Sequence, residues 1–398
     1  MLQISQRVES LASSATLAMS QKSNELKAQG VDVINMSIGE PDFNTPEFIK
    51  DAAKKAIDDN FSHYAPVAGY LSLRKAIADK LMRENGLEYT VDEIVVGNGA
   101  KQALCNVVLS TVNPGDEVII PMPAWVSYVE MVKLAEGIPV TVTTGLEQDF
   151  KITPEQLEKA ITPKSRLLML CSPSNPSGAI YSKEELDALA RVLKDYPQVM
   201  ILSDEIYEHI SYIGKPASIA RCEGMKDRTV IINGVSKSYA MTGWRIGYMA
   251  GPKTIAKAVN KLQGQYTSAC SSIAQKAAEA AYTGPQDCVA EMREAFRRRR
   301  DIIMELAVNV PGWRFTEPVG AFYFFPDVSE LLGKRTAEGK EIGTSGDYCM
   351  YLLEKANVAC VDGDAFGAPG YIRLSYATSD DQIREAMRRI AKATAELK

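Results

Sequence analysis

The chain has 398 residues, of which 46% are hydrophobic and 24% are charged, proportions typical of a globular protein that exclude a disordered chain or a fibre. The net charge of −5 gives no bias toward nucleic acid or an anionic membrane. No apolar run approaches the roughly 18 residues that span a bilayer. Residues 1–30 carry scattered charges and no apolar block, so we expect no signal peptide.

Cysteine and histidine usage limits the kinds of site that the chain can hold. The seven cysteines stand far apart, and no pair has CxxC spacing. This pattern disfavours a zinc site or a disulfide framework and predicts reduced thiols in a cytoplasmic protein. The only histidines are His63 and His209, so we expect no metal site, and a Ser-His-Asp hydrolase would have to use one of these two.

Helix and strand patterns alternate through most of the chain. The periodicity and stop signals predict helices over 5–29, 46–59, 70–84, a stretch after residue 100, 126–136, 154–161 and 183–195. Short apolar runs predict strands over 94–96, 117–120, 140–142, 167–171, 199–203, 229–232 and 246–249. Such alternation is typical of an α/β fold with a mostly parallel sheet covered by helices on both faces. Ligands bind these sheets at the carboxyl ends of the strands, where we expect the chemistry.

The pattern changes after about residue 285. A long charged helix over 287–307 precedes predicted short strands over 313–315, 321–325 and 371–375 and a last helix over 379–397. At about 150 residues per domain, the length predicts two or three domains, or one large domain with an appendage. We therefore expect an N-terminal arm with part of a small domain (1–45), a large domain (46–285) and a small α+β C-terminal domain (286–398).

The run Arg297–Arg300 is the one basic cluster that invites a nucleic-acid interpretation. Glu291 and Glu294 lie upstream on the same predicted helix, at spacings that allow ion pairs with it. We therefore interpret the run as a solvated helix face and expect no nucleic-acid partner and no membrane partner.

A lysine among small residues marks the most informative segment, 236–248. Lys237 follows a predicted strand, and Arg245 lies eight residues further on. A lysine is usually a solvated surface charge. At the carboxyl end of a strand its pKa can be lowered, and the free amine can then form a Schiff base.

Three further polar residues stand in apolar or rigid surroundings. Asp204 directly follows an apolar strand, and Asn175 lies in a turn whose proline and glycine residues hold one side chain in place. Arg373 lies within an apolar strand and therefore needs an anionic partner. Segment 97–102 joins a strand to a helix, where backbone amides bind phosphate well. Gln102 replaces the third glycine of a dinucleotide motif, which excludes the NAD interpretation.

Segment 236–248 is very similar to the cofactor-lysine signature of the class I aminotransferases, the aspartate aminotransferase family. The other motifs follow in the family's order over nearly the whole chain. The resemblance implies a two-domain fold of PLP fold type I and the cofactor pyridoxal 5'-phosphate (PLP). It implies that Lys237 holds PLP as an internal aldimine and then serves as the base. It further implies that Asp204 keeps the pyridine nitrogen protonated and that Tyr207 bonds the phenolic oxygen.

The resemblance also assigns the remaining binding residues. Asn175 contacts the phenolic oxygen and the substrate α-carboxylate, which also meets Arg373 and the backbone of Gly39. Trp125 stacks on the pyridine ring. The phosphate contacts are the amides of Ala100 and Lys101, the guanidinium of Arg245, and Tyr64 of a neighbouring subunit, which implies a homodimer with shared sites.

Two departures from the family pattern accompany these assignments. Gly234 stands where the family often has a phosphate-binding serine, which puts that contact in doubt and leaves open whether Ser236 compensates. Ser177 replaces a threonine, a conservative change.

The predicted reaction is a ping-pong transamination between an amino acid and a 2-oxo acid. Lys101 matches a position that some bacterial-type enzymes of the family use to select dicarboxylic acids, which favours aspartate with 2-oxoglutarate. The alternatives are an aromatic or alanine aminotransferase, a PLP-dependent β-lyase, or a regulatory domain of a DNA-binding protein. Ala12 stands where enzymes that accept prephenate often carry lysine or threonine, so prephenate activity is left open.

Overall fold

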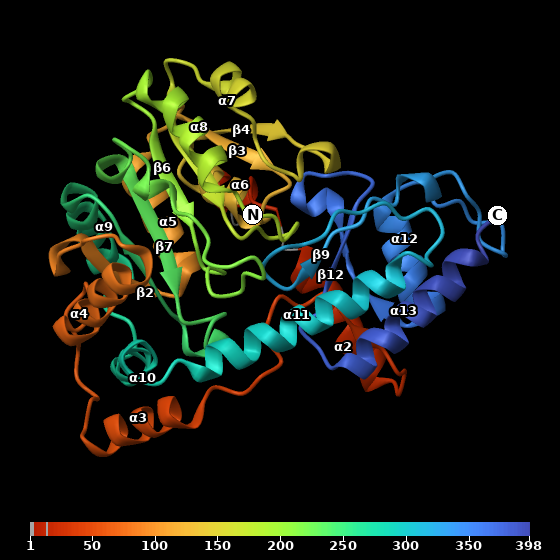
Figure 1. Cartoon of the computed structure of the whole chain (residues 1–398), viewed down its shortest axis with the longest axis horizontal. Coiled ribbons are helices and arrows are strands. Elements are labelled where there is room, and N and C mark those ends of the chain that lie inside the picture. Colours follow the sequence, from red (N-terminus) through yellow and green to blue (C-terminus); the bar gives the residue numbers. More distant parts are fainter. Residues whose placement is uncertain (1–3, 13–14) are drawn as a thin grey trace.

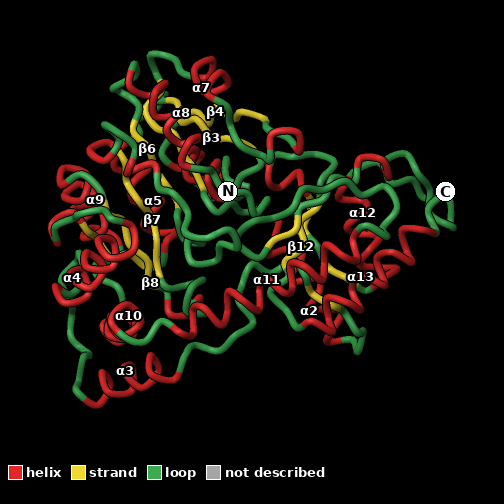
Figure 2. The backbone as a smooth tube through the Cα atoms, viewed as in Figure 1, coloured by secondary structure: helices red, strands yellow, loops and turns green. Residues whose placement is uncertain are grey.

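The computed structural model describes residues 4–12 and 15–398. A seven-stranded sheet and its helices form one part of the molecule, and the C-terminal elements gather beside it (Figure 1). The 21-residue helix α11 (Asp287–Ala307) has the predicted bounds and runs from the first part to the second. The backbone trace shows helices surrounding the strands of the large sheet (Figure 2).

The large sheet has the strand order β2-β8-β7-β6-β5-β3-β4. Its strands are β2 (Ile94–Asn98), β3 (Glu117–Met122), β4 (Ile138–Thr143), β5 (Ser165–Cys171), β6 (Met200–Asp204), β7 (Thr229–Gly234) and β8 (Ile246–Ala250). Strands β4, β3, β5, β6 and β7 are parallel, whereas β8 runs antiparallel to both β7 and β2. The predicted mostly parallel sheet is confirmed.

Alternate side chains of β5 show how the sheet is covered on both faces. Leu167 and Met169 pack into one apolar cluster, with α5 (Ala100–Thr111) and α9 (Lys253–Tyr266). Leu168 and Leu170 pack into another, with α7 (Pro154–Ala160) and α8 (Lys183–Lys194). Successive side chains of a strand point to opposite faces, so a strand covered twice must be apolar throughout.

The second part is built around short strands and an aromatic core. β9 (Tyr323–Phe324), β12 (Ile372–Ser375) and β11 (Val361–Asp362) form an antiparallel sheet, and β1 (Ile34–Asn35) pairs in parallel with β10 (Val358–Ala359). Phe296 of α11 and Phe322 lie in the same buried cluster. The remaining α-helices are α1 (Gln6–Glu9), α2 (Ala15–Ala28), α3 (Glu47–Asp58), α4 (Leu71–Lys80), α6 (Ser127–Leu134), α10 (Ser272–Thr283), α12 (Ser345–Tyr351) and α13 (Asp380–Ala395).

Two predicted elements are wrong. The single helix over 5–29 is two helices, α1 and α2, because the chain leaves the helix before Ala12, whose amide donates to Glu130 Oε2 at 2.9 Å. The predicted strand over 313–315 contributes only one paired residue, Arg314, opposite Asp327. Residues 313–315 directly follow a turn at Gly312, whose φ of 73° lies in the left-handed region, so the extended backbone cannot continue back through that glycine.

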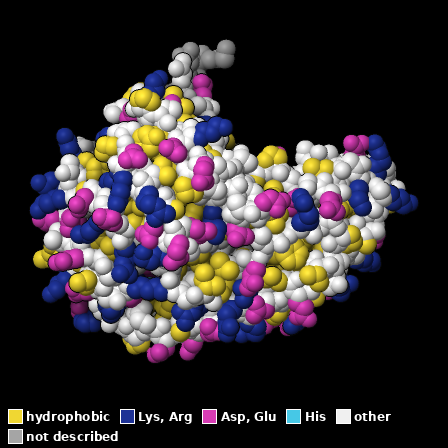
Figure 3. Space-filling model, turned by 45° about the horizontal axis from the view of Figure 1, so that its top comes forward, with side chains coloured by type: hydrophobic (Ala, Val, Ile, Leu, Met, Phe, Trp, Pro, Cys, Tyr) yellow, Lys and Arg dark blue, Asp and Glu magenta, His cyan; other side chains and the backbone are white. Residues whose placement is uncertain are grey.

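The arginine run of α11 is neutralised. Arg297 pairs with Glu294, as predicted, at 2.6 Å. The other three pair mainly with acids from outside the helix, which the sequence did not indicate: Arg298 with Asp380, Arg299 with Asp42, and Arg300 with Glu317. Basic and acidic side chains are interspersed over the face drawn in Figure 3. Among the described residues, no helix is both long enough and apolar enough to cross a membrane.

The pair between Arg299 and Asp42 should stabilise the fold measurably. Arg299 is 6% exposed and donates to both oxygens of Asp42, at 2.7 and 2.8 Å. We predict that Arg299→Ala lowers the free energy of unfolding by about 2–3 kcal/mol, because charged hydrogen bonds are lost. The exposed control, Arg297→Ala, should change it by less than about 0.5 kcal/mol in the same urea titration. Equal effects would contradict the prediction.

Candidate active site

A cavity of about 290 Å³ opens at the carboxyl edge of the large sheet. Asn175 follows β5, Asp204 ends β6 and Lys237 follows β7, three neighbouring strands. Because β8 is antiparallel, its first residue pairs with Asn98 at the end of β2. Arg245, directly before β8, therefore lies at the same edge. Of the residues predicted for the site, these line the cavity: Gly39, Ala100, Lys101, Trp125, Asn175, Asp204, Tyr207, Ser236, Lys237, Arg245 and Arg373.

Lys237 directs its amine into the cavity without an acidic partner in hydrogen-bond contact among the described residues. Nζ donates to the carbonyl of Gly39 at 2.5 Å and lies 5.8 Å from the ring centres of Tyr207 and Phe322. Burial lowers the pKa of Lys237 to about 8, against the smaller opposing effect of Glu40. The amine is therefore available as a nucleophile and a base near neutral pH.

Asp204 is a buried carboxylate whose direct partners are neutral. Oδ2 accepts from the hydroxyl of Tyr128 at 2.7 Å, and Oδ1 accepts from the amide of Ile206 at 3.2 Å. Burial raises the pKa of Asp204 to about 6, although both hydrogen bonds and the charge of Lys237 oppose that rise. A cationic group bound in the cavity would remove the cost of ionising this carboxylate.

An anion cradle lies at the start of α5. The amides of Ala100 and Lys101 are the first two of this helix and have no carbonyl one turn earlier to accept them. Within the described part of the chain, the guanidinium of Arg245 donates to backbone carbonyls alone, of Thr242 at 2.9 Å and of Asn98 at 3.3 Å. It lies so close to Gly99 that a Cβ there would stand 2.1 Å from Nη2. Glycine at position 99 is thus needed to leave room for the cation.

The departure at Gly234 has a steric reason. Gly234 pairs with Gly247 across β7 and β8, and a Cβ on residue 234 would lie 2.8 Å from the Cα of Gly247. A serine does not fit there without moving the strands. Ser236 lines the cavity two residues later and is the serine available on this segment.

Arg373 supplies a second cation at the other side of the cavity. It is 2% exposed and donates to Asn175 Oδ1 at 2.9 Å and to the carbonyl of Ser37 at 2.7 Å. Its Nε has no hydrogen-bond partner within the described part of the chain, and its guanidinium lies 4.5 Å from the ring centre of Tyr323. A buried guanidinium held by neutral acceptors is suited to an anionic ligand.

Aromatic side chains form the remaining walls. The ring of Trp125 meets Tyr128 edge-on at 5.5 Å, and the ammonium of Lys101 lies 4.8 Å from the centre of the Trp125 ring. Burial lowers the pKa of Lys101, and the charge of Arg245 adds to this effect. Tyr207 and Tyr323 share a hydrogen bond of 2.7 Å between their hydroxyls.

Sequence reasoning missed several members of the site. Tyr128 lies three residues after Trp125, at the start of α6, and this helical spacing could have identified it as a second wall residue. Tyr323 gave no such signal, because its hydroxyl reaches Tyr207 only through tertiary packing. Thr242 also lines the cavity and donates to Glu40. One predicted residue, Tyr64, does not line the cavity of its own chain and is 99% exposed.

Comparisons with known proteins identify the family. The model of the class I and II aminotransferases matches residues 31–390. The chain is 51% identical to an aspartate aminotransferase of Geobacillus stearothermophilus, over 98% of each chain. It is 50% identical to an aspartate/prephenate aminotransferase of Nitrosomonas europaea, over 98% of this chain and 99% of that one. The crystal structure of the aspartate aminotransferase from Rhizobium meliloti matches with a TM-score of 0.97 and 46% identity over all of both chains.

The chain belongs to the class I and II aminotransferases and has their fold. It is a PLP-dependent enzyme. The cavity fits this cofactor, because a buried carboxylate without a cationic hydrogen-bond partner, a free amine and an anion cradle are arranged around one space. When bound, PLP withdraws electrons from the Cα of an amino acid.

The lowered pKa of Lys237 gives a prediction for the apoprotein. An amine reacts with acetic anhydride only when it is deprotonated, so labelling of Lys237 should rise with pH around a midpoint of about 8 rather than the usual 10.5. Lys54 is a control, since the hydrogen bond from its ammonium to Asp51 raises its pKa. Peptide mass spectrometry across a pH series measures both sites. Labelling of both lysines around the same high pH would contradict the prediction.

Proposed function

We propose that this enzyme transfers the amino group of aspartate to 2-oxoglutarate in a ping-pong cycle. The observation that carries the proposal is a pair of cations without acidic partners among the described residues. Arg373 lies deep in the cavity, and Lys101 lies at its wall beside Trp125. Two such cations suit a substrate with two carboxylates. A Thermus thermophilus aspartate aminotransferase, 43% identical to this chain, was solved with maleate, a dicarboxylate.

In this proposal, Lys237 binds the cofactor covalently and, once freed, carries the Cα proton. The lowered pKa of Lys237 supports this role, because the amine must accept and return a proton near neutral pH. Asp204 faces the ring nitrogen, and its burial favours a charged partner there. Tyr207 bonds the phenolic oxygen, and its link to Tyr323 orients its hydroxyl.

The anionic groups are divided between the two sides of the cavity. The substrate α-carboxylate binds Arg373, Asn175 and the backbone of Gly39. The cofactor phosphate binds the cradle formed by the amides of Ala100 and Lys101 with Ser236 and Arg245. Trp125 covers the ring face. Separate cations prevent the two anions from competing for one site.

A half-reaction experiment tests this function. The PLP-loaded enzyme is mixed with each amino acid in turn, and the loss of absorbance of the lysine-bound cofactor is recorded. We predict that aspartate and glutamate react fastest and that 2-oxoglutarate restores the absorbance. Lys237→Ala should lose almost all turnover and the borohydride-reducible adduct. A reduced adduct on another lysine would refute the assignment of Lys237. Preference for an aromatic amino acid would refute aspartate as the preferred amino donor.

The β-lyase alternative predicts other products. Elimination at Cβ releases ammonia and pyruvate, whereas transamination releases only the 2-oxo acid of the donor. The relatives reported above are named as aminotransferases, which does not favour the lyase. The same reaction mixtures can be assayed for ammonia.

Lys101 should determine the preference for an acidic side chain. A charge-assisted hydrogen bond is worth about 1.5–3 kcal/mol, or roughly ten- to a hundredfold in specificity. We predict that Lys101→Ser lowers kcat/KM for aspartate and glutamate by that factor and leaves alanine and phenylalanine nearly unchanged. An equal loss of kcat/KM for all four amino acids would instead show that Lys101 contributes to cofactor binding and not to substrate selection.

We also propose a homodimer in which Tyr64 completes the partner's phosphate site. A tyrosine exposed over 99% of its surface is unusual, because its ring gains from burial.

We propose that the chain divides into the segments 1–45, 46–285 and 286–398 given above. Its seven free cysteines support a cytoplasmic location.

Subunit mixing tests the shared site. The Lys237→Ala homodimer should be inactive because it lacks the lysine. The Tyr64→Ala homodimer should be inactive at a PLP concentration too low to load its weakened phosphate site. Hybrid dimers contain one site with a native Lys237 and a native Tyr64 from the partner. Random exchange should therefore restore up to about a quarter of the native activity, because half of the dimers are hybrids with one working site each. Absence of restored activity in verified hybrids would contradict the shared site.

A further inference from the structure

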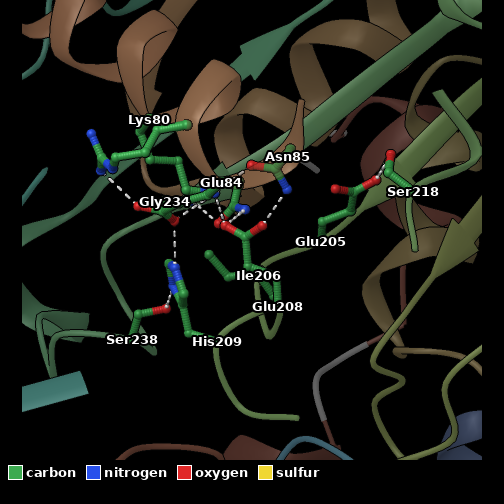
Figure 4. Close-up of polar contacts among 12 residues, drawn as sticks. Lys80, Glu84, Asn85, Glu205, Ile206, Glu208, His209, Ser218, Gly234 and Ser238 are labelled. Carbon is green, nitrogen blue, oxygen red and sulfur yellow. Dashed lines mark hydrogen bonds and ion pairs between the residues drawn. The ribbon is translucent and has the colours of Figure 1, made fainter. Parts of the chain in front are cut away.

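A chain of buried and partly buried polar residues lies behind the cavity and ends beside Lys237. It consists of Lys80, Glu84, Glu208, His209 and Ser238, and we call it the buried polar chain (Figure 4). None of these residues lines the cavity. They come from α4, from the π-helical turn Leu81–Asn85 that follows it, and from the loops after β6 and β7. The buried polar chain therefore joins helix α4 to the loop that follows Asp204 and to the loop that carries Lys237.

Lys80 provides the cation at one end. Its side chain is 1% exposed, and Nζ donates to Glu208 Oε1 and to Asn85 Oδ1, the latter at 3.0 Å. Glu84 Oε2 lies 3.6 Å from the same nitrogen. Glu84, Glu208 and His209 are close enough together to resemble a metal site, but the ammonium already supplies their positive charge.

The protonation of Glu84 determines how His209 bonds. Burial opposes ionisation of Glu84, but the hydrogen bond from His209 and the charge of Lys80 outweigh it and lower the pKa to about 2. An ionised carboxylate can only accept, so His209 Nε2 must donate to Glu84 Oε2, 2.8 Å away. His209 Nδ1 is then the atom that bonds Ser238 Oγ, also at 2.8 Å.

This bond anchors the loop that carries Lys237. Ser238 is 2% exposed and is the next residue after Lys237. Glu208 Oε1 also accepts from Asn233 Nδ2 at 2.7 Å, so the same chain holds the loop at a second point, the end of β7. The stretch that carries Lys237 is thus held at Asn233 before the lysine and at Ser238 after it.

We propose that His209 is a positioning residue for Lys237, acting through Ser238. In the function proposed above, on which this inference rests, the amine of Lys237 is released in the first half-reaction and would bind the cofactor again in the second. A side chain that moves in each cycle needs a fixed backbone to return to the same place. His209 lies outside the cavity, so its loss should affect kcat and leave substrate binding by Arg373 and Asn175 unchanged.

Three variants separate this role from general stability. His209→Gln can reach Glu84 but not Ser238, His209→Asn can reach Ser238 but not Glu84, and Ser238→Ala removes the hydroxyl that bonds Nδ1. We expect His209→Gln and Ser238→Ala each to lower kcat about tenfold with KM unchanged. The double variant His209→Gln/Ser238→Ala should lose no more than either single variant, because both remove one interaction. His209→Asn should recover most of the loss.

Ser218→Ala is the matched control. Ser218 is 5% exposed and donates to the buried carboxylate of Glu205 at 2.6 Å, and none of its hydrogen bonds among the described residues goes to the loop of Lys237. It should lower thermal stability to a similar extent and leave kcat unchanged. Losses that add in the double variant, or an equal loss of kcat in His209→Asn or Ser218→Ala, would overturn the proposal.

A second measurement does not depend on turnover or on the identity of the amino donor. PLP is added to the apoprotein, samples are reduced with borohydride at intervals, and the modified Lys237 peptide is quantified. His209→Gln and Ser238→Ala should slow this capture about tenfold, and His209→Asn should restore it. Capture at the native rate in Ser238→Ala would refute the positioning role even if aspartate proves to be the wrong substrate.

Discussion

The site depends on keeping buried charges apart from one another. Asp204 bonds a phenol and an amide, Arg373 bonds an amide oxygen and a carbonyl, and Lys237 bonds a carbonyl. Had these groups formed ion pairs with each other, their charges would be satisfied and the cavity would offer little to an anionic ligand. Neutral hydrogen-bond partners hold each group in place and leave its charge for the cofactor and the substrate.

The architecture of the sheet makes this separation possible. The parallel strands β5, β6 and β7 deliver an amide, a carboxylate and an amine to adjacent positions along one edge. The antiparallel strand β8 adds Arg245 at that edge, close to the start of α5. The short strand β12 brings Arg373 from the second part of the molecule. Each charge therefore comes from a different element, and the rigid strands set the distances between them.

The balance of charge differs between the cavity and the polar chain behind it. In the buried polar chain, Lys80 lies against Glu208 and 3.6 Å from Glu84, and Glu84 also bonds His209, so both carboxylates have partners within the protein. Such a network resists change because breaking it would leave a buried charge unpaired. Among the described residues, the charges of the cavity lack such partners and are left for a ligand. The segments between the two regions carry Asp204 and Lys237.

The sequence by itself determined the parallel sheet, the family and more than half of the residues that line the cavity, because strand patterns and the segments around Lys237, Asp204 and Asn175 are local features. It did not indicate Tyr128 as the partner of Asp204, Tyr323 as the partner of Tyr207, or Glu84 as the partner of His209. These contacts join residues 76, 116 and 125 positions apart, and no local pattern encodes them. Only the tertiary structure decided which neutral groups surround each charge, because burial and pairing arise when distant segments pack together.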